Sequence, residues 1–203
     1  MQAYLASSRV VDFTHPAVAA LARELGQGAA DQEERVRRCF EFVRDQVLHS
    51  VDGGIHSPVT CLASEVLAQR TGLCYAKSHL LAALLRALGV PTGFCYQRLR
   101  LDGPDSPCCL HGLNAVWLEA HGWYRIDARG NKPGVAARFC PPREQLAFLP
   151  SLPGEQDLPG ILAEPLPQVV AAQEGASDLP SLLLQLPDWD GLAFAETQGA
   201  QAS

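Results

Sequence analysis

The segment from Cys74 to Leu88 constrains the fold of this chain more than any other part of the sequence. It is nearly continuous in alanine and leucine, and it ends at Gly89 with Pro91 just beyond, a pattern typical of a helix C-terminus. A helix that is apolar on almost every side needs other elements of structure to enclose it. The sequence therefore predicts a domain built around one buried central helix.

Three shorter helices are predicted before this central helix, because apolar residues recur there with helical spacing. They cover residues 14–25, 31–47 and 64–71, with Thr14, Asp31 and Ser64 as the expected N-caps. Asp31 is followed three residues later by Glu34, which is the signature of a capping box.

After Pro91 the sequence pattern changes from helical to extended. Residues 92–101, 110–119 and 123–127 predict three strands, the last two joined near His121 and Gly122,. Helices followed by an antiparallel sheet indicate an α+β fold.

Charge and proline content divide the chain near residue 140. Residues 1–140 carry 15 basic and 13 acidic side chains, whereas residues 141–203 carry one basic and nine acidic side chains and nine of the 15 prolines. Because 27 of those last 63 residues are apolar, the segment is more than a linker. We expect a domain over 1–140 and an acidic extension over 141–203 that packs on it, with short helices near 166–174 and 179–186 and a disordered last dozen residues.

The composition argues against several classes of protein. Apolar residues make up 47% of the chain and charged residues 19%, which is unlike a disordered chain or a coiled coil. The net charge of −6 disfavours nucleic acid as a partner. No apolar run approaches the roughly 20 residues that a membrane span requires, so no membrane partner is expected.

The cysteines and the N-terminus predict the compartment. Seven cysteines, an odd number without regular spacing, indicate free thiols in a reducing environment. The first residues show no secretory signal pattern. We therefore expect a cytoplasmic protein; the sequence leaves its oligomeric state open.

Three residues combine into a candidate catalytic site. Cys74 begins the predicted central helix, where the helix dipole and the unpaired backbone N–H groups favour a thiolate and can stabilise an oxyanion. His111 opens one predicted strand and Asp127 closes the next, so a hairpin can bring a base and its orienting carboxylate to the helix end. A Cys-His-acid set is the arrangement expected for acyl transfer.

The simplest turn between those strands conflicts with this arrangement. A three-residue turn at residues 120–122 would place Asp127 opposite Ala115, about 13 Å along the strand from His111. The hypothesis therefore requires a turn centred nearer Glu119, or a β-bulge.

Weaker candidates accompany the three residues. Gln69, five residues before Cys74, is a candidate second oxyanion donor; Gln97 and Asn114 are alternatives for the same role. The candidates for lining a substrate groove or its rim are Trp117, Trp123, Tyr124, Asn131 and Lys132. Each has a structural alternative: an exposed helix position for Gln69, the core for the aromatic residues and a surface turn for the last two.

Two blocks of the sequence resemble the core of the transglutaminase-like superfamily of cysteine enzymes. They are TGLCYAKSHLLAALLRALGVPTGF and HGLNAVWLEAHGWYRIDARGNKPG, and the resemblance covers roughly residues 31–140. It implies the papain-like core of a small, bacterial-type member, with Cys74 as nucleophile, His111 as general base and then acid, and Asp127 as orienter. It implies no cofactor. The vicinal pair Cys108-Cys109 departs from the family pattern.

These features predict an enzyme that attacks a peptide or isopeptide amide and forms a thioester. Hydrolysis is preferred over cross-linking, because the chain is small and lacks the calcium-binding and β-sandwich regions of the large cross-linking members. The expected partner is a peptide or protein amide substrate. Two alternatives remain: a non-catalytic peptide-binding module on the same fold, and a metal protein that uses Cys74 with His79 or the 108–111 segment.

Overall fold

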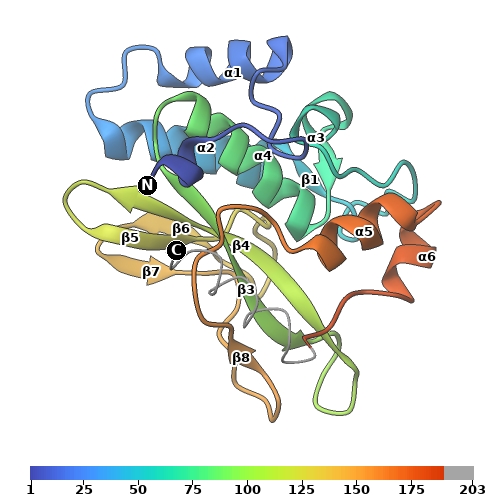
Figure 1. Ribbon diagram of the computed structural model, residues 1–203. Coiled ribbons are helices and arrows are strands. Elements are labelled where there is room, and N and C mark those ends of the chain that lie inside the picture. Colours follow the sequence, from blue (N-terminus) through green and yellow to red (C-terminus); the bar gives the residue numbers. More distant parts are fainter. Residues whose placement is uncertain (190–203) are drawn as a thin grey trace.

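The computed structural model describes residues 1–189 of the chain. A layer of helices lies against one face of a curled antiparallel sheet (Figure 1), so the α+β class is confirmed. The disorder predicted for the last dozen residues concerns positions outside the described residues.

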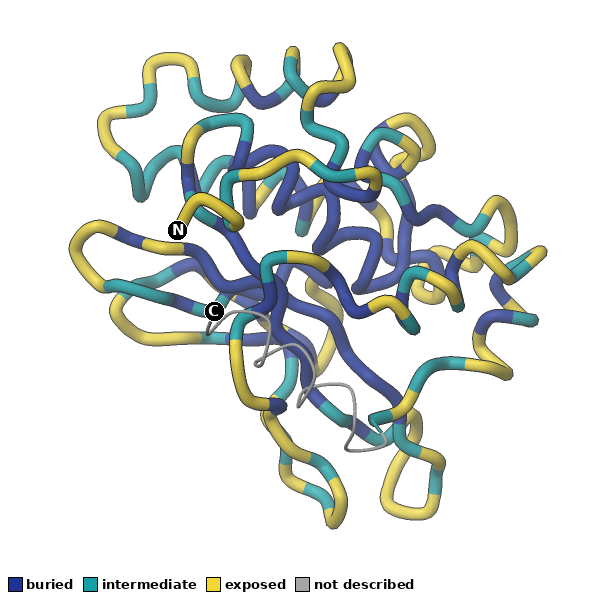
Figure 2. Tube along the Cα trace, in the orientation of Figure 1, coloured by how far each residue is buried: buried dark blue, intermediate teal, exposed yellow. Residues whose placement is uncertain are grey.

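Four α-helices follow a short 3-10 helix, η1 (Gln2–Leu5). They are α1 (Pro16–Gly26), α2 (Gln32–Gln46), α3 (Ala63–Gln69) and α4 (Cys74–Ala87). Every residue of α4 from Cys74 to Arg86 is buried, and Figure 2 shows this helix as a continuous buried segment at the centre of the molecule. The predicted central helix is therefore confirmed.

The N-caps follow the prediction only in part. Asp31 caps α2 by accepting a hydrogen bond from the backbone N–H of Glu34, at 2.8 Å. The caps predicted at Thr14 and Ser64 are wrong. Helix α1 begins with a proline, which has no N–H to be capped. In α3 the carboxylate of Glu65 accepts a hydrogen bond of 3.1 Å from the backbone N–H of Leu62. This N–H group therefore has a partner without a serine cap.

The main sheet has the strand order β5-β4-β3-β8 with antiparallel pairing throughout. Its strands are β3 (Thr92–Arg100), β4 (Cys108–Leu118), β5 (Gly122–Ile126) and β8 (Gln156–Asp157). The first three match the predicted strands to within a few residues. Two small sheets were not predicted: β1 (Leu48–His49) with β2 (Thr71–Gly72), and β6 (Arg138–Cys140) with β7 (Arg143–Gln145).

A glycine allows the first turn of α4 to approach β4 closely. A Cβ atom added to Gly112 would lie 2.9 Å from Cδ1 of Tyr75 and 3.4 Å from its Cα. A larger residue at this position would force Tyr75 or the backbone around it to shift. The glycine therefore sets the distance between the start of α4 and the strand that carries His111.

The C-terminal extension packs on the helices and the sheet. It contains the predicted short helices as α5 (Pro167–Gly175) and α6 (Leu179–Leu183). Leu162 exchanges backbone hydrogen bonds of 2.8 and 2.9 Å with Phe94 of β3, and Leu182 is 1% exposed. The domain boundary near residue 140 stays a prediction.

The central helix, α4, has 14 residues. None of the helices in residues 1–189 is both long and apolar enough to cross a membrane.

Candidate active site

Cys74 is the first residue of α4, and the helix start around it is open to a ligand. The N-cap is Leu73, whose side chain makes no capping hydrogen bond; an apolar N-cap costs the helix about 1 kcal/mol relative to serine or aspartate. The first intrahelical bond runs from the N–H of Lys77 to the carbonyl of Leu73. The N–H groups of Cys74, Tyr75 and Ala76 therefore have no acceptor within the helix.

Asp127 holds the imidazole of His111 in place. Nε2 of His111 lies 2.8 Å from Oδ2 of Asp127. The same carboxylate accepts hydrogen bonds of 3.1 Å from the backbone N–H groups of Arg129 and Ala147, and Asp127 is 1% exposed. Burial raises the pKa of Asp127, but His111 and these two N–H groups outweigh burial and hold the pKa below its ordinary value. The carboxylate is therefore ionised.

The pKa of His111 is influenced by Cys74 as well as by Asp127. Burial lowers this pKa, but the charges of Asp127 and Cys74 and the hydrogen bond to Asp127 raise it to about 10. Because Asp127 occupies Nε2, the ring nitrogen left for the sulfur is Nδ1. The ring of Phe148 packs edge-on against the imidazole, with 5.1 Å between the ring centroids. Because its pKa is about 10, the imidazole of His111 is protonated at neutral pH.

The register of β4 and β5 explains how Asp127 reaches His111. Leu118 pairs with Gly122, so the turn covers residues 119–121 and the turn expected at 120–122 is wrong. Gly122 has a φ of 72° and begins β5 instead of closing the turn. Continuing this register places Asp127 opposite Leu113, two residues from His111. Such diagonal neighbours lie about 7–8 Å apart, which side chains can span.

Cys74 and His111 line a cavity of about 690 Å³. Eight apolar side chains from the end of β3 and the residue after it, from the segment after β7 and from α6 and its C-terminal side also line it: Leu99, Leu101, Ala147, Phe148, Leu149, Leu152, Leu183 and Leu186. Asp127 does not line the cavity; it contacts His111 through the hydrogen bond to Nε2.

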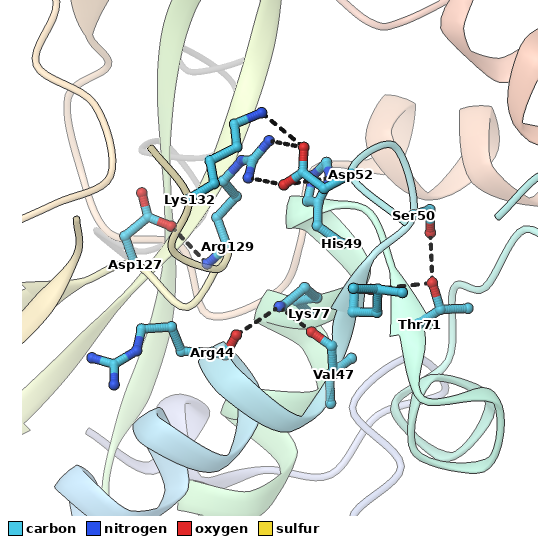
Figure 3. Close-up of polar contacts among 11 residues, drawn as sticks. Arg44, Val47, His49, Ser50, Asp52, Thr71, Lys77, Asp127, Arg129 and Lys132 are labelled. Carbon is cyan, nitrogen blue, oxygen red and sulfur yellow. Dashed lines mark hydrogen bonds and ion pairs between the residues drawn. The ribbon is translucent and has the colours of Figure 1, made fainter. Parts of the chain in front are cut away.

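One wall of the cavity carries positive charge. Arg129 and Lys132 line it, and both bind the carboxylate of Asp52 (Figure 3), Lys132 at 2.7 Å and Nη2 of Arg129 at 3.1 Å. Burial raises the pKa of Asp52, but these two bonds lower it well below its ordinary value. The ionised Asp52 thus fixes the loop before α3 to the loop that follows Asp127.

Lys77 lies inside the fold, one turn after Cys74. It is 0% exposed, and its ammonium nitrogen donates to the backbone carbonyls of Val47 and, at 3.4 Å, Arg44 (Figure 3). Burial is the main reason that its pKa falls to about 7. The side chain therefore joins α4 to the backbone carbonyls at the end of α2.

The structure does not bring the predicted oxyanion donors to Cys74. Gln69 is the last residue of α3 and is exposed outside the cavity lining. Gln97 is buried and donates to Asp157 at 2.9 Å, and Asn114 is buried and donates to the carbonyl of Ser78 at 3.1 Å. Neither Gln97 nor Asn114 lines the cavity.

Of the remaining candidates, only Lys132 lines the cavity. Trp117 and Trp123 pack against each other with 5.8 Å between their ring centroids, and Tyr124 is 3% exposed. Asn131 holds a turn by accepting from the N–H of Ala137 at 2.7 Å. The structural alternatives therefore hold for Tyr124, which lies in the core, and for Asn131, which lies in a surface turn. Trp117 is 37% exposed and Trp123 is half-buried, so the core alternative is wrong for Trp117.

Sequence reasoning missed His49, which also lines the cavity. It lies in β1 and pairs with Gly72 of β2, two residues before Cys74. Two-residue strands have no hydrophobic period, so no signal in the sequence placed this histidine at the site.

No metal cluster is found in the described part of the chain. None of its His, Cys, Asp and Glu side chains form a group of three or more that could hold an ion. His79, a candidate ligand in the metal alternative, lies within the core, and its Nδ1 is 2.7 Å from the carbonyl oxygen of Cys61. All seven cysteines are free.

Comparison with known proteins shows the family to which the chain belongs. The model of the Transglutaminase-like superfamily matches residues 19–128, more than half of the chain, and this span contains Cys74, His111 and Asp127. None of the curated proteins compared with the chain matches it.

Among solved structures, the chain is similar to a candidate cysteine protease from Cytophaga hutchinsonii. The identity is 20%, the TM-score is 0.49, and the match covers 62% of this chain and 40% of the other. It is also similar to the periplasmic domain of TgpA from Pseudomonas aeruginosa, with 21% identity, a TM-score of 0.47, and coverage of 62% and 45%. The matched region spans less than half the length of either protein.

Proposed function

Because this chain belongs to the transglutaminase-like superfamily, we propose that it is a cysteine-dependent acyl-transfer enzyme with Cys74, His111 and Asp127 as its catalytic triad. One observation carries the proposal. Cys74, at an uncapped helix start, shares a cavity with an imidazole that Asp127 orients through a 2.8 Å hydrogen bond.

The reaction begins with the thiolate of Cys74 and the imidazolium of His111. The thiolate attacks the carbonyl carbon of an amide, a C–S bond forms, and the π electron pair moves to the oxygen. When the intermediate collapses, the C–N bond breaks and His111 gives its proton to the leaving amine. A second nucleophile, deprotonated by His111, then releases the acyl group from the sulfur.

We propose water as the second nucleophile and a peptide or isopeptide amide as the substrate. The cavity supports the choice of a peptide substrate, because its apolar walls can hold a chain segment beside the sulfur. The choice of water rests on the small size of the chain. Leu183 and Leu186 of the extension line the cavity, and we propose that they restrict it to short or unfolded segments. The free cysteines support a reducing, cytoplasmic location.

Incubation with a pool of unfolded peptides tests the proposal, with the Cys74→Ala variant as control. We expect new peptide termini in mass spectra only with the wild-type protein. A fluorescent primary amine added to the same reaction reports cross-linking, because it is incorporated only if an amine competes with water. Binding of peptides without any product would support the non-catalytic module instead.

A further inference from the structure

His49 lies beside the start of the nucleophile helix. In the pairing of β1 with β2 it is opposite Gly72, and the N–H of Ser50 donates to the carbonyl of Gly72 at 3.1 Å. The strand that carries the imidazole is thus fixed to the residues that lead directly into Cys74. The imidazole lines the same cavity as Cys74 and His111.

The imidazole of His49 is enclosed but unpaired. The residue is 8% exposed, and Nδ1 has no hydrogen-bond partner in residues 1–189. The nearest carboxylate oxygen, Oδ2 of Asp52, is 4.0 Å from Nδ1 and is already bound by Arg129. Burying a polar group without a partner costs free energy. Because Nδ1 is enclosed, Nε2 is the ring nitrogen that can serve a ligand in the cavity.

The surroundings keep this imidazole neutral. Burial and the positive charges of Arg129, Lys77 and His111 lower the pKa of His49 to about 3, although Asp52 acts in the opposite direction. A neutral imidazole does not compete with His111 as a base at physiological pH. It can still donate a hydrogen bond, and enzymes use a neutral histidine in this way to polarise a carbonyl.

We infer that His49 is the side-chain donor of the oxyanion site: its Nε2–H and the free N–H groups at the start of α4 bind the substrate carbonyl oxygen. This inference rests on the proposed function. As the C–S bond to Cys74 forms, the oxygen gains the electron pair of the π bond, and the donors stabilise that charge. When the C–N bond breaks, the pair returns to the carbonyl and His49 keeps its proton throughout.

Two small reagents separate this role from a structural one. p-Nitrophenyl acetate acylates Cys74 through a tetrahedral intermediate with an oxyanion, whereas iodoacetamide alkylates the sulfur directly and forms no oxyanion. The variants are His49→Phe, which has no donor, His49→Gln, which places an N–H near the position of Nε2, and His49→Asn, which places it near Nδ1.

We expect His49→Phe to slow acylation about 100-fold, while its alkylation rate stays within twofold of wild type. His49→Gln should acylate at least tenfold faster than His49→Asn, and this comparison of two polar variants stands even if the phenylalanine variant fails to fold. Equal acylation by the two polar variants, or equal slowing of both reactions in His49→Phe, would overturn the inference. A wild-type Cys74 inert to both reagents would instead refute the proposed function.

Discussion

Replacing Asp127 with asparagine tests how the site is held together. The substitution keeps the shape of the side chain and removes its charge. In the wild-type protein Oδ2 accepts from His111 and from the N–H of Ala147, and Oδ1 accepts from the N–H of Arg129. In asparagine an NH₂ group, which cannot accept a hydrogen bond, replaces one of these two oxygens. At least one buried N–H donor therefore loses its acceptor, whichever oxygen is replaced.

The size of the loss follows from these contacts. A hydrogen bond to a charged group contributes about 1.5–3 kcal/mol, and a buried N–H left without an acceptor costs about 1–3 kcal/mol. Breaking a buried ion pair by removing one partner costs about 3–5 kcal/mol. We therefore expect Asp127→Asn to lower the free energy of unfolding by roughly 3–5 kcal/mol.

The loss should depend on pH in a defined window. Folding lowers the pKa of Asp127. The contribution of Asp127 to the free energy of unfolding is therefore present above its unfolded pKa of about 3.9 and is lost as the pH falls through the folded value. The pKa of His111 is raised to about 10. Its contribution is therefore complete below the unfolded pKa of about 6.5 and is lost as the pH rises through the folded value. The difference between wild type and variant should be largest between about pH 4 and 6.5.

Urea unfolding followed by circular dichroism measures this difference at pH 5.5 and pH 10. A matched control is Asp157→Asn, which removes the charge of an exposed carboxylate whose Oδ1 accepts from Arg125 and from Gln97; the asparagine oxygen can keep both bonds. This control should cost less than about 1 kcal/mol. A loss in Asp127→Asn of less than about 1 kcal/mol, or one equal at both pH values, would refute the ion pair.

Three further predictions concern the surroundings of the site. Lys77→Met should make stability fall more steeply with pH than in the wild type between about pH 7, the folded pKa of Lys77, and its unfolded pKa near 10.5, because Lys77 binds more protons in the unfolded chain there and so offsets the loss from His111; urea unfolding of both proteins at pH 6.5 and 10 measures it, and an equal pH dependence would be contrary evidence. Gly112→Ala should cost about 1–3 kcal/mol by overpacking, since its Cβ would lie 2.9 Å from Tyr75; an unchanged melting temperature would show that the approach is not tight. The double variant Leu183→Ala with Leu186→Ala should speed the reaction of Cys74 with a bulky maleimide and leave iodoacetamide unaffected; an unchanged maleimide rate would show that the extension does not restrict access.

The central helix and the three long strands could be predicted because each carries a clear pattern over many residues. Helix α4 is apolar on nearly all sides, and β3, β4 and β5 have extended runs bounded by turn residues. The order of Cys74, His111 and Asp127 along these elements was enough to place them at one end of the fold.

The register of the last hairpin and the oxyanion donor could not be predicted. Moving the turn by one residue shifts every pair by two, and Gly122 fits either as the end of the turn or as the start of β5. Gln69 is close to Cys74 in sequence, but Arg70 adopts a φ of 54° and residues 71–72 form a strand. These intervening residues carry the chain away from α3. His49 is near Cys74 only through pairing between two short strands, a contact distant in sequence.

Thiol alkylation with mass mapping tests the central claim most directly. Burial raises the pKa of four competing thiols to about 12, those of Cys39, Cys61, Cys95 and Cys109, so the remaining competitors are the half-exposed Cys108 and Cys140. At neutral pH we predict that iodoacetamide modifies Cys74 at least tenfold faster than either, and that His111→Ala removes this advantage. An inert Cys74, or a Cys74 whose rate is unchanged in His111→Ala, would contradict the account.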